Sequence, residues 1–325
     1  MAGHDRRRVS DLVTLGDIEA AAGRIGGFVR RTPLIDVGPV KTPPFAADAA
    51  LKLKLECLQV TGSFKPRGAS NKLALADPAA VTRGVCTGSG GNHGLAVAYV
   101  AYKFGAPATI YVPQSTPDAK RDKIAAWGAR VVVHGAVWDE ANEAAHDAAE
   151  EQGLVYVHPF ADPAVIAGQG TVALEVLADA PEVDTLVVAI GGGGLVSGIA
   201  AAAKALRPGL KVVGVEPTGA PTLFESLKAE RLVTLERIET AAGTLAPRRS
   251  MAINLQLIGE HVDRIVLVSD EEMRQAARWL WFELGVAAEL SGAAAVAALM
   301  TGRHRPQPHE TTVALVCGAG TDGIG

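Results

Sequence analysis

One lysine stands in a short run of small residues whose composition could make its amine reactive. The run Thr61–Gly68 (TGSFKPRG) places Lys65 shortly after a glycine and a serine, and directly before Pro66. This composition is typical of a loop that opens into a helix, which we expect to begin near Arg67. A lysine shielded from water in such a turn loses its proton readily and can act as a nucleophile. Taken alone, the run fits an ordinary surface lysine at a helix start better.

Four consecutive glycines follow the apolar run Thr185–Ile190, and a helical pattern begins after them. They are Gly191, Gly192, Gly193 and Gly194. Glycines let the backbone turn several N–H groups toward one point, and a helix N-terminus adds its positive end, so this segment predicts a phosphate cradle. It matches neither a P-loop nor G-x-G-x-x-G. Glu216 ends the next strand, where dinucleotide-binding folds place an acid that binds the ribose. A nicotinamide-binding oxidoreductase therefore remains an alternative interpretation of this segment.

A second glycine-rich loop, Thr87–Gly94 (TGSGGNHG), lies between a short apolar run and a helical pattern. The side chains of Ser89 and Asn92, together with glycine N–H groups, suit a carboxylate or another small anion. The alternative is a helix N-cap supplied by Asn92. His93 is interpreted as a structural hydrogen-bonding residue. A fourth segment, Val313–Thr321, is a buried strand that ends in small residues, where ligands collect on open parallel sheets; a chain terminus packed on the sheet would also explain it.

Short apolar runs and alanine-rich helical runs alternate along the chain and must position these segments. Alternation of this kind predicts mainly parallel sheets with helices on both faces. The run Leu51–Glu56 alternates with period two and predicts a half-buried strand. The other expected strands are Gly84–Cys86, Ala108–Val112, Arg130–Val133, Leu154–Val157, Thr185–Ile190, Lys211–Glu216, Arg264–Val268 and Thr312–Val316. The expected helices include Leu95–Phe104, Asp139–Glu151, Val165–Ala178 and Leu195–Leu206.

Size and composition limit the function classes. A chain of 325 residues with 48% hydrophobic residues is long enough for two α/β domains. The net charge of −4 argues against a nucleic-acid partner, and no apolar run is long enough for a membrane partner. The three cysteines are far apart and form no zinc-binding pattern, and the arginines at positions 6–8 precede no signal-peptide run. We therefore expect a cytoplasmic protein without a metal site.

Together these segments resemble the fold-type II pyridoxal-phosphate enzymes, and specifically the branch of serine/threonine dehydratases and serine racemases. The resemblance runs from about Arg31–Leu34 to the C-terminus and includes His158–Phe160, Val165–Thr171 and Gly214–Pro217. It implies a two-domain fold similar to the β subunit of tryptophan synthase. A discontinuous large domain (1–81 and 160–325) would bind the cofactor beside a small domain (82–159). The nicotinamide alternative becomes a minor one.

The resemblance also implies a role for each segment. Lys65 would bind pyridoxal 5'-phosphate covalently, with Phe64 packed near its ring, and Asn92 would hydrogen-bond the cofactor's 3-hydroxyl. The residues implied for the substrate carboxylate are Ser89, Gly90, Gly91, Asn92 and His93. Those implied for the phosphate are Gly191, Gly192, Gly193, Gly194 and the amide of Leu195. Cys317 stands where the family usually has serine or threonine facing the pyridine nitrogen.

Three departures from the family pattern narrow the expected reaction. A thiol at Cys317 donates weakly to a pyridine, so the ring stays neutral, which suits β-elimination. Racemases have a serine at the position of Gly90, and glycine has no proton to give. The cation site of serine racemase pairs a glutamate with an aspartate, whereas this chain has Glu216 and Thr222, a poor set for a hard cation.

The resemblance therefore implies a pyridoxal-phosphate-dependent ammonia-lyase. Its substrate would be a β-hydroxy amino acid, L-threonine or L-serine, converted to a 2-oxo acid and ammonia. A serine racemase and a dehydratase of 3-hydroxyaspartate or phenylserine are the alternatives. A homodimer is expected from the family.

Overall fold

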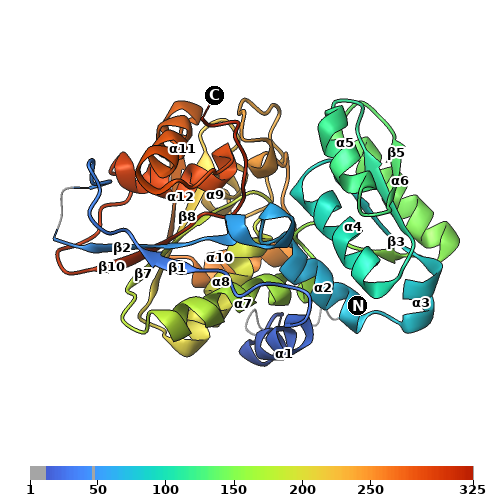
Figure 1. Cartoon of the computed structure of the whole chain (residues 1–325), viewed down its shortest axis with the longest axis horizontal. Coiled ribbons are helices and arrows are strands. Elements are labelled where there is room, and N and C mark those ends of the chain that lie inside the picture. Colours follow the sequence, from blue (N-terminus) through green and yellow to red (C-terminus); the bar gives the residue numbers. More distant parts are fainter. Residues whose placement is uncertain (1–11, 46–47, 325) are drawn as a thin grey trace.

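Two β-sheets flanked by helices organise the chain in the computed structural model, which describes residues 12–45 and 48–324 (Figure 1). Within these residues the larger sheet has six strands in the order β1-β2-β10-β7-β8-β9, and the smaller has four in the order β5-β4-β3-β6. The larger sheet comprises β1 (Leu34–Asp36), β2 (Ala50–Lys54), β10 (Thr311–Leu315), β7 (Thr185–Ala189), β8 (Lys211–Pro217) and β9 (Arg264–Val268). The smaller comprises β5 (Arg130–Val133), β4 (Ala108–Val112), β3 (Val85–Gly88) and β6 (Val155–Tyr156).

Every pairing in both sheets is parallel except that of β1 with β2, so the α/β class with mainly parallel sheets is confirmed. In Figure 1, α11 and α12 lie above the larger sheet, with α7, α8 and α10 below it. The helices are α1 (Leu15–Ile25), α2 (Lys65–Leu75), α3 (Pro78–Arg83), α4 (Asn92–Phe104), α5 (Asp118–Ala125), α6 (Trp138–Gln152), α7 (Pro163–Asp179), α8 (Gly194–Leu206), α9 (Thr222–Lys228), α10 (Ala252–His261), α11 (Asp270–Leu284) and α12 (Leu290–Met300).

The predicted strands and helices are present, with ends that differ by up to three residues. The continuous apolar run of β7 is buried along its whole length, as expected for a strand covered on both faces. The prediction of a half-buried strand over Leu51–Glu56 was wrong in one respect. Lys54 is fully buried because α7 covers that face, where Glu175 accepts a hydrogen bond from the lysine at 2.6 Å. Glu56 is buried in a 3-10 turn (Glu56–Leu58) that follows the strand.

The sequence predicted that this helix begins near Arg67. Helix α2 begins two residues earlier, at Lys65. The chain before it turns sharply, because Thr61 and Gly62 both adopt left-handed backbone angles (φ of 67° and 83°). Glycine adopts this region without strain, whereas threonine does so rarely. The turn therefore places Lys65 in the first turn of a helix whose next residues, Pro66 and Arg67, are buried.

Each of the two sheets packs within its own hydrophobic cluster. The larger includes residues of β7, β8 and α12, and the smaller includes residues of β3, β4 and α4. The smaller also takes in Ala69 and Leu73 of α2. The domain limits 1–81, 82–159 and 160–325 stay a prediction. In the described part of the chain, no helix has the length and apolar character needed to cross a bilayer.

Candidate active site

Lys65 is the first residue of α2, directly after the connection from β2, and its amine is largely shielded from water. Its Nζ donates a hydrogen bond to the Pro159 carbonyl at 2.8 Å and lies 5.0 Å from the centre of the Phe64 ring. Burial lowers the pKa of Lys65 to about 8, although the nearby Cys317 and Glu289 act in the opposite direction. A larger fraction of this amine than of an ordinary lysine is therefore unprotonated and nucleophilic near neutral pH.

The turn that follows β10 packs directly on the lysine segment. The Phe64 N–H donates to the Cys317 carbonyl at 3.4 Å, and the Ala319 N–H donates to the Gly62 carbonyl at 2.8 Å. The Cys317 thiol is buried and donates to the Ser291 carbonyl at 3.4 Å. Burial raises the pKa of Cys317, so the group stays a neutral thiol. The structure thus brings together Lys65 and Cys317, which are far apart in the sequence.

The glycine loop that precedes α8 has no room for side chains. A Cβ atom at Gly192 would lie 2.3 Å from the Phe160 ring, and one at Gly194 would lie 2.6 Å from the Phe160 carbonyl oxygen. Gly193 caps α8 with a φ of 96°, a conformation that glycine adopts without strain. The first N–H groups of the helix, including that of Leu195, have no partner within the helix. The loop therefore combines free backbone N–H groups with packing so close that a side chain at any of the four positions would collide with its neighbours.

The second loop presents Asn92 to the larger sheet rather than to its own helix. Helix α4 begins at Asn92, and Gly91 occupies the N-cap position without a side-chain cap. The alternative interpretation of Asn92 as the cap was therefore wrong. Its Nδ2 donates to Oε1 of Glu289 at 2.8 Å, across the gap between the two sheets. The Ser89 hydroxyl accepts the Gly91 N–H at 3.3 Å and so shapes the loop.

His93 is buried beside this loop and serves the structure. Its Nε2 lies 2.9 Å from the Val157 carbonyl, so Nε2 carries the hydrogen and donates it. Burial lowers the pKa of His93 to about 3, with the neighbouring Lys65 acting in the same direction. The ring is therefore neutral at physiological pH, which agrees with its interpretation as a structural hydrogen-bonding residue.

A threonine fills the space next to Gly90. A Cβ at Gly90 would lie 2.2 Å from the Thr116 hydroxyl oxygen and 3.0 Å from the Thr116 Cβ. Thr116 itself is buried, 7% exposed, in the connection between β4 and α5. Any side chain at position 90 thus requires Thr116 to move or to become smaller.

Sequence reasoning missed two residues that join the predicted segments. Thr244 has its carbonyl 2.7 Å from a Cβ built at Gly191 and its methyl 3.8 Å from one built at Gly91. Its hydroxyl donates to Glu289 Oε1 at 3.3 Å. Glu289 precedes α12 within Ala287–Gly292, and an acid among small and apolar residues was a signal that could have singled it out. These contacts, with those of Cys317 to the lysine segment, bring the four predicted segments together.

Glu216 and Thr222, the pair considered for a cation site, both bind backbone groups of the protein. Glu216 is buried and accepts the N–H groups of Leu223 and Phe224 at 2.9 and 2.7 Å, at the start of α9. Burial raises its pKa to about 8, and these two donors act in the opposite direction. Thr222 donates to the Pro247 carbonyl at 2.7 Å. Within the described residues, no three histidine, cysteine or acidic side chains gather as a metal site.

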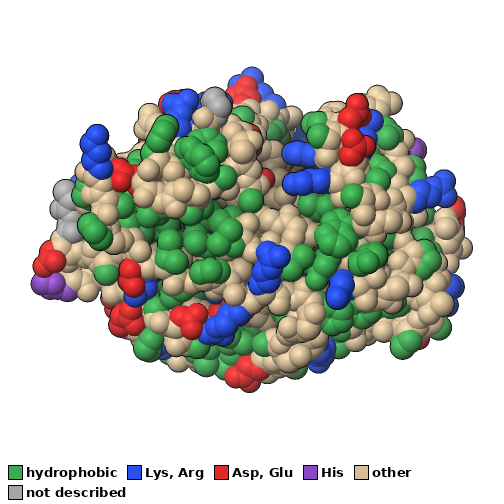
Figure 2. All heavy atoms as spheres, in the orientation of Figure 1, with side chains coloured by type: hydrophobic (Ala, Val, Ile, Leu, Met, Phe, Trp, Pro, Cys, Tyr) green, Lys and Arg blue, Asp and Glu red, His purple; other side chains and the backbone are tan. Residues whose placement is uncertain are grey.

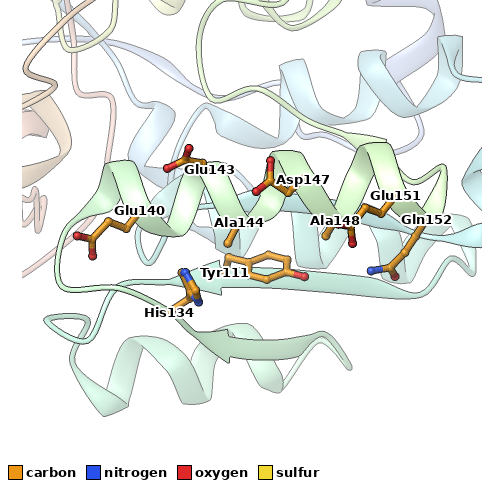
Figure 3. Close-up of a pocket in the computed structure, with 9 residues that line it drawn as sticks. All are labelled: Tyr111, His134, Glu140, Glu143, Ala144, Asp147, Ala148, Glu151 and Gln152. Carbon is orange, nitrogen blue, oxygen red and sulfur yellow. The ribbon is translucent and has the colours of Figure 1, made fainter.

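The surface agrees with a site between the two sheets. Figure 2 shows a hollow where the part that carries α4–α6 meets the rest of the molecule, with Lys and Arg side chains at its rim. A separate cavity of about 400 Å³ lies against α6 (Figure 3). None of the predicted site residues lines it, and its walls carry the acidic side chains of Glu140, Glu143, Asp147 and Glu151.

The Lys65 amine contacts Pro159, and the next residue, Phe160, packs against the glycine loop before α8, so a buried lysine and a glycine-rich loop lie close together in an enzyme fold of two mainly parallel sheets. A comparison with family models identifies the class of enzyme. The model described as "pyridoxal-phosphate dependent enzyme" matches residues 25–318, and the chain belongs to this family. The resemblance to fold-type II pyridoxal-phosphate enzymes is confirmed, and pyridoxal phosphate is the cofactor.

Relatives with known names cover most of the chain. It is 40% identical to the L-threonine ammonia-lyase of Thermotoga maritima over 89% of its own length and 71% of the relative's. It is 35% identical to a catabolic L-threonine dehydratase of Staphylococcus aureus, over 97% of its own length and 91% of the relative's. Among solved structures, maize serine racemase superposes with a TM-score of 0.88 at 33% identity, over 95% and 94% of the two chains.

The residues present fit this cofactor. A lysine with a pKa near 8 suits the covalent bond to its aldehyde, and the backbone N–H groups of the glycine loop at the start of α8 suit its phosphate. Asn92 donates one N–H of its amide to Glu289, which leaves the second for a ligand oxygen.

Proposed function

We propose that the protein eliminates water from L-threonine or L-serine and yields a 2-oxo acid and ammonia. The names of the relatives support this substrate class. The observation that carries the proposal is the Lys65 amine, which is held by the Pro159 carbonyl and has its pKa lowered to about 8.

The chain's own residues perform five tasks in this proposal. Lys65 holds the cofactor covalently and, once freed, takes the α-proton of the amino acid as general base. The Gly191–Gly194 loop and the amide of Leu195 bind the phosphate. The Ser89 hydroxyl and the backbone N–H groups from Gly90 to Asn92 hold the substrate carboxylate, and the free N–H of the Asn92 side chain faces the cofactor's 3-hydroxyl. Pyridoxal phosphate, when bound, withdraws electrons from the α-carbon and so acidifies its hydrogen.

The neighbourhood of Cys317 and Gly90 supports elimination. A buried thiol with a raised pKa remains neutral and is a weak donor to a pyridine nitrogen. Gly90 offers no acid or base to the second face of the substrate, and Thr116 occupies the space beside it. The likeness to serine racemase makes racemisation the second candidate.

One panel of substrates separates these candidates. The purified holoenzyme is incubated with L-threonine, L-serine, 3-hydroxyaspartate and phenylserine, and 2-oxo acid, ammonia and the D-enantiomer are measured in each. We expect 2-oxo acid and ammonia in equal amounts from L-threonine or L-serine. Formation of D-serine in excess of 2-oxo acid would favour the racemase, and no product from any substrate would refute both.

We also propose a cytoplasmic homodimer. The three cysteines, Cys57, Cys86 and Cys317, are all free, which supports a reducing compartment. Trp281 and Phe282 on α11 are 45% and 81% exposed, and such aromatic residues are common at interfaces between subunits. Sedimentation velocity at micromolar concentration should give about twice the mass of the chain, and a monomer would contradict the dimer.

A further inference from the structure

The carboxyl group of Glu289 lies at the meeting point of four separate segments. Its Oε1 accepts from Asn92 at the start of α4 and from the hydroxyl of Thr244. Its backbone N–H donates to the Gly318 carbonyl at 3.1 Å, just after β10. Gly318 must lack a side chain there, because a Cβ would lie 2.3 Å from Oε1.

These contacts fix the position of the carboxyl group. Thr244 also hydrogen-bonds the hydroxyl of Ser291 in the first turn of α12, so two hydroxyl groups stand beside the carboxyl. Burial raises the pKa of Glu289, and the nearby Asp322 acts in the same direction. With or without its proton, the group presents an oxygen that accepts a hydrogen bond.

An accepting oxygen determines how the amide of Asn92 is turned. An asparagine side chain has a donating and an accepting end of nearly equal shape, so its partner decides which end faces which way. Glu289 binds the nitrogen end, and the second N–H of that nitrogen is left for another oxygen. The hydrogen bond also spans the two sheets, because α4 packs on β3 and β4 whereas Glu289 precedes α12, which packs on the larger sheet.

We propose that Glu289 is a positioning residue that turns the amide of Asn92 toward the cofactor and ties the loop at the start of α4 to the larger sheet. This inference rests on the proposed function, because Asn92 must bind an oxygen of the cofactor for its orientation to matter. It assigns to Glu289 no contact with the reacting atoms. A residue that acts only through Asn92 should have no effect once Asn92 is removed.

A double-mutant cycle on cofactor binding tests this. The dissociation constant of pyridoxal 5'-phosphate is measured from its visible absorbance with cofactor-free wild type, Glu289→Ala, Asn92→Ala and the double variant. We expect each single change to weaken binding roughly 10-fold, the value of about one hydrogen bond to a polar or charged group, and the double variant to be no weaker than Asn92→Ala. Losses that add, or no loss in Glu289→Ala, would overturn the proposal.

Two further variants separate positioning from general damage. Glu289→Gln keeps an oxygen that can face Asn92, so we expect binding within about 3-fold of wild type; a loss as large as that of Glu289→Ala would contradict the hydrogen-bonding role. Glu236→Ala removes an exposed acid and should leave binding unchanged. Melting temperatures of the cofactor-free proteins report any loss of folding separately. If wild type itself forms no borohydride-sensitive absorbance, the proposed function fails; if only the coupling is missing, the role of Glu289 fails alone.

Discussion

Arg67 donates two hydrogen bonds to the carboxylate of Glu56, from Nε and from Nη2, each 2.8 Å long. Both side chains are fully buried. The Nη1 of Arg67 also donates to Glu175 at 2.7 Å, and Lys54 donates to the same carboxylate at 2.6 Å. Two positive and two negative groups thus form one buried network. Because Arg67 is two residues beyond Lys65, this network anchors the helical turn that carries the reactive amine.

Removal of Arg67 should destabilise the fold strongly. Arg67→Ala leaves Glu56 buried without its cation, and such a change costs about 3–5 kcal/mol. The free energy of unfolding is measured in urea on the cofactor-free protein. Arg237→Ala is the control, because its pair with Glu239 is exposed and contributes at most about 1 kcal/mol. A loss for Arg67→Ala no larger than that of the control would show that the network does not hold α2.

The rate of cofactor capture should depend on pH through Lys65. Only the unprotonated amine attacks an aldehyde, and burial lowers the pKa of Lys65 to about 8. The second-order rate constant should therefore rise with pH, reach half its maximum near pH 8 and then level off. Stopped-flow absorbance measures it, and the same series with a free lysine derivative corrects for titration of the cofactor. A half-maximum near the ordinary lysine pKa of about 10.4 would mean that the amine is exposed to water.

The glycine cradle should tolerate no methyl group. Gly192→Ala places a Cβ 2.3 Å from the Phe160 ring, so the loop or the ring must move. Overpacking of this kind costs about 1–3 kcal/mol, and we expect cofactor binding to weaken by roughly 10-fold or more. Gly209→Ala is the matched control, because nothing lies within 4 Å of its Cβ. If the two variants bound the cofactor with equal affinity, the phosphate would not bind at this loop.

Thr116 should decide whether a serine can enter at position 90. Gly90→Ser alone collides with the hydroxyl and methyl of Thr116, at 2.2 and 2.6 Å from the new Cβ, and should lower the melting temperature. The added change Thr116→Ala removes both atoms and leaves only a Cβ contact of 3.0 Å, so it should recover most of the lost melting temperature. We expect the double variant to form D-serine from L-serine, measured by chiral chromatography. A stable double variant that makes no D-serine would contradict the account of the second face of the substrate.

Much of this fold follows from local patterns, and the site follows from them in part. Continuous apolar runs predicted the buried parallel strands, and the four glycines predicted the sharp turn into α8, because both depend on neighbours in the sequence. The burial of Lys54 and Glu56 was not predictable, because their partners lie on helices distant in the sequence or in the next segment. Lys54 pairs with Glu175 on α7, and Glu56 pairs with Arg67 on α2. The contacts of Glu289 and Thr244 also depend on tertiary packing, and no periodicity in the sequence encodes them.

The central claim is a covalent bond between Lys65 and pyridoxal phosphate. Borohydride reduction of the holoenzyme, followed by proteolysis and mass spectrometry of the peptides, locates this bond directly. We predict that the added mass is on the peptide containing Lys65, and that the Lys65→Ala protein carries none. Added mass on Lys54, which is also buried but paired with Glu175, or on no lysine at all, would contradict the account.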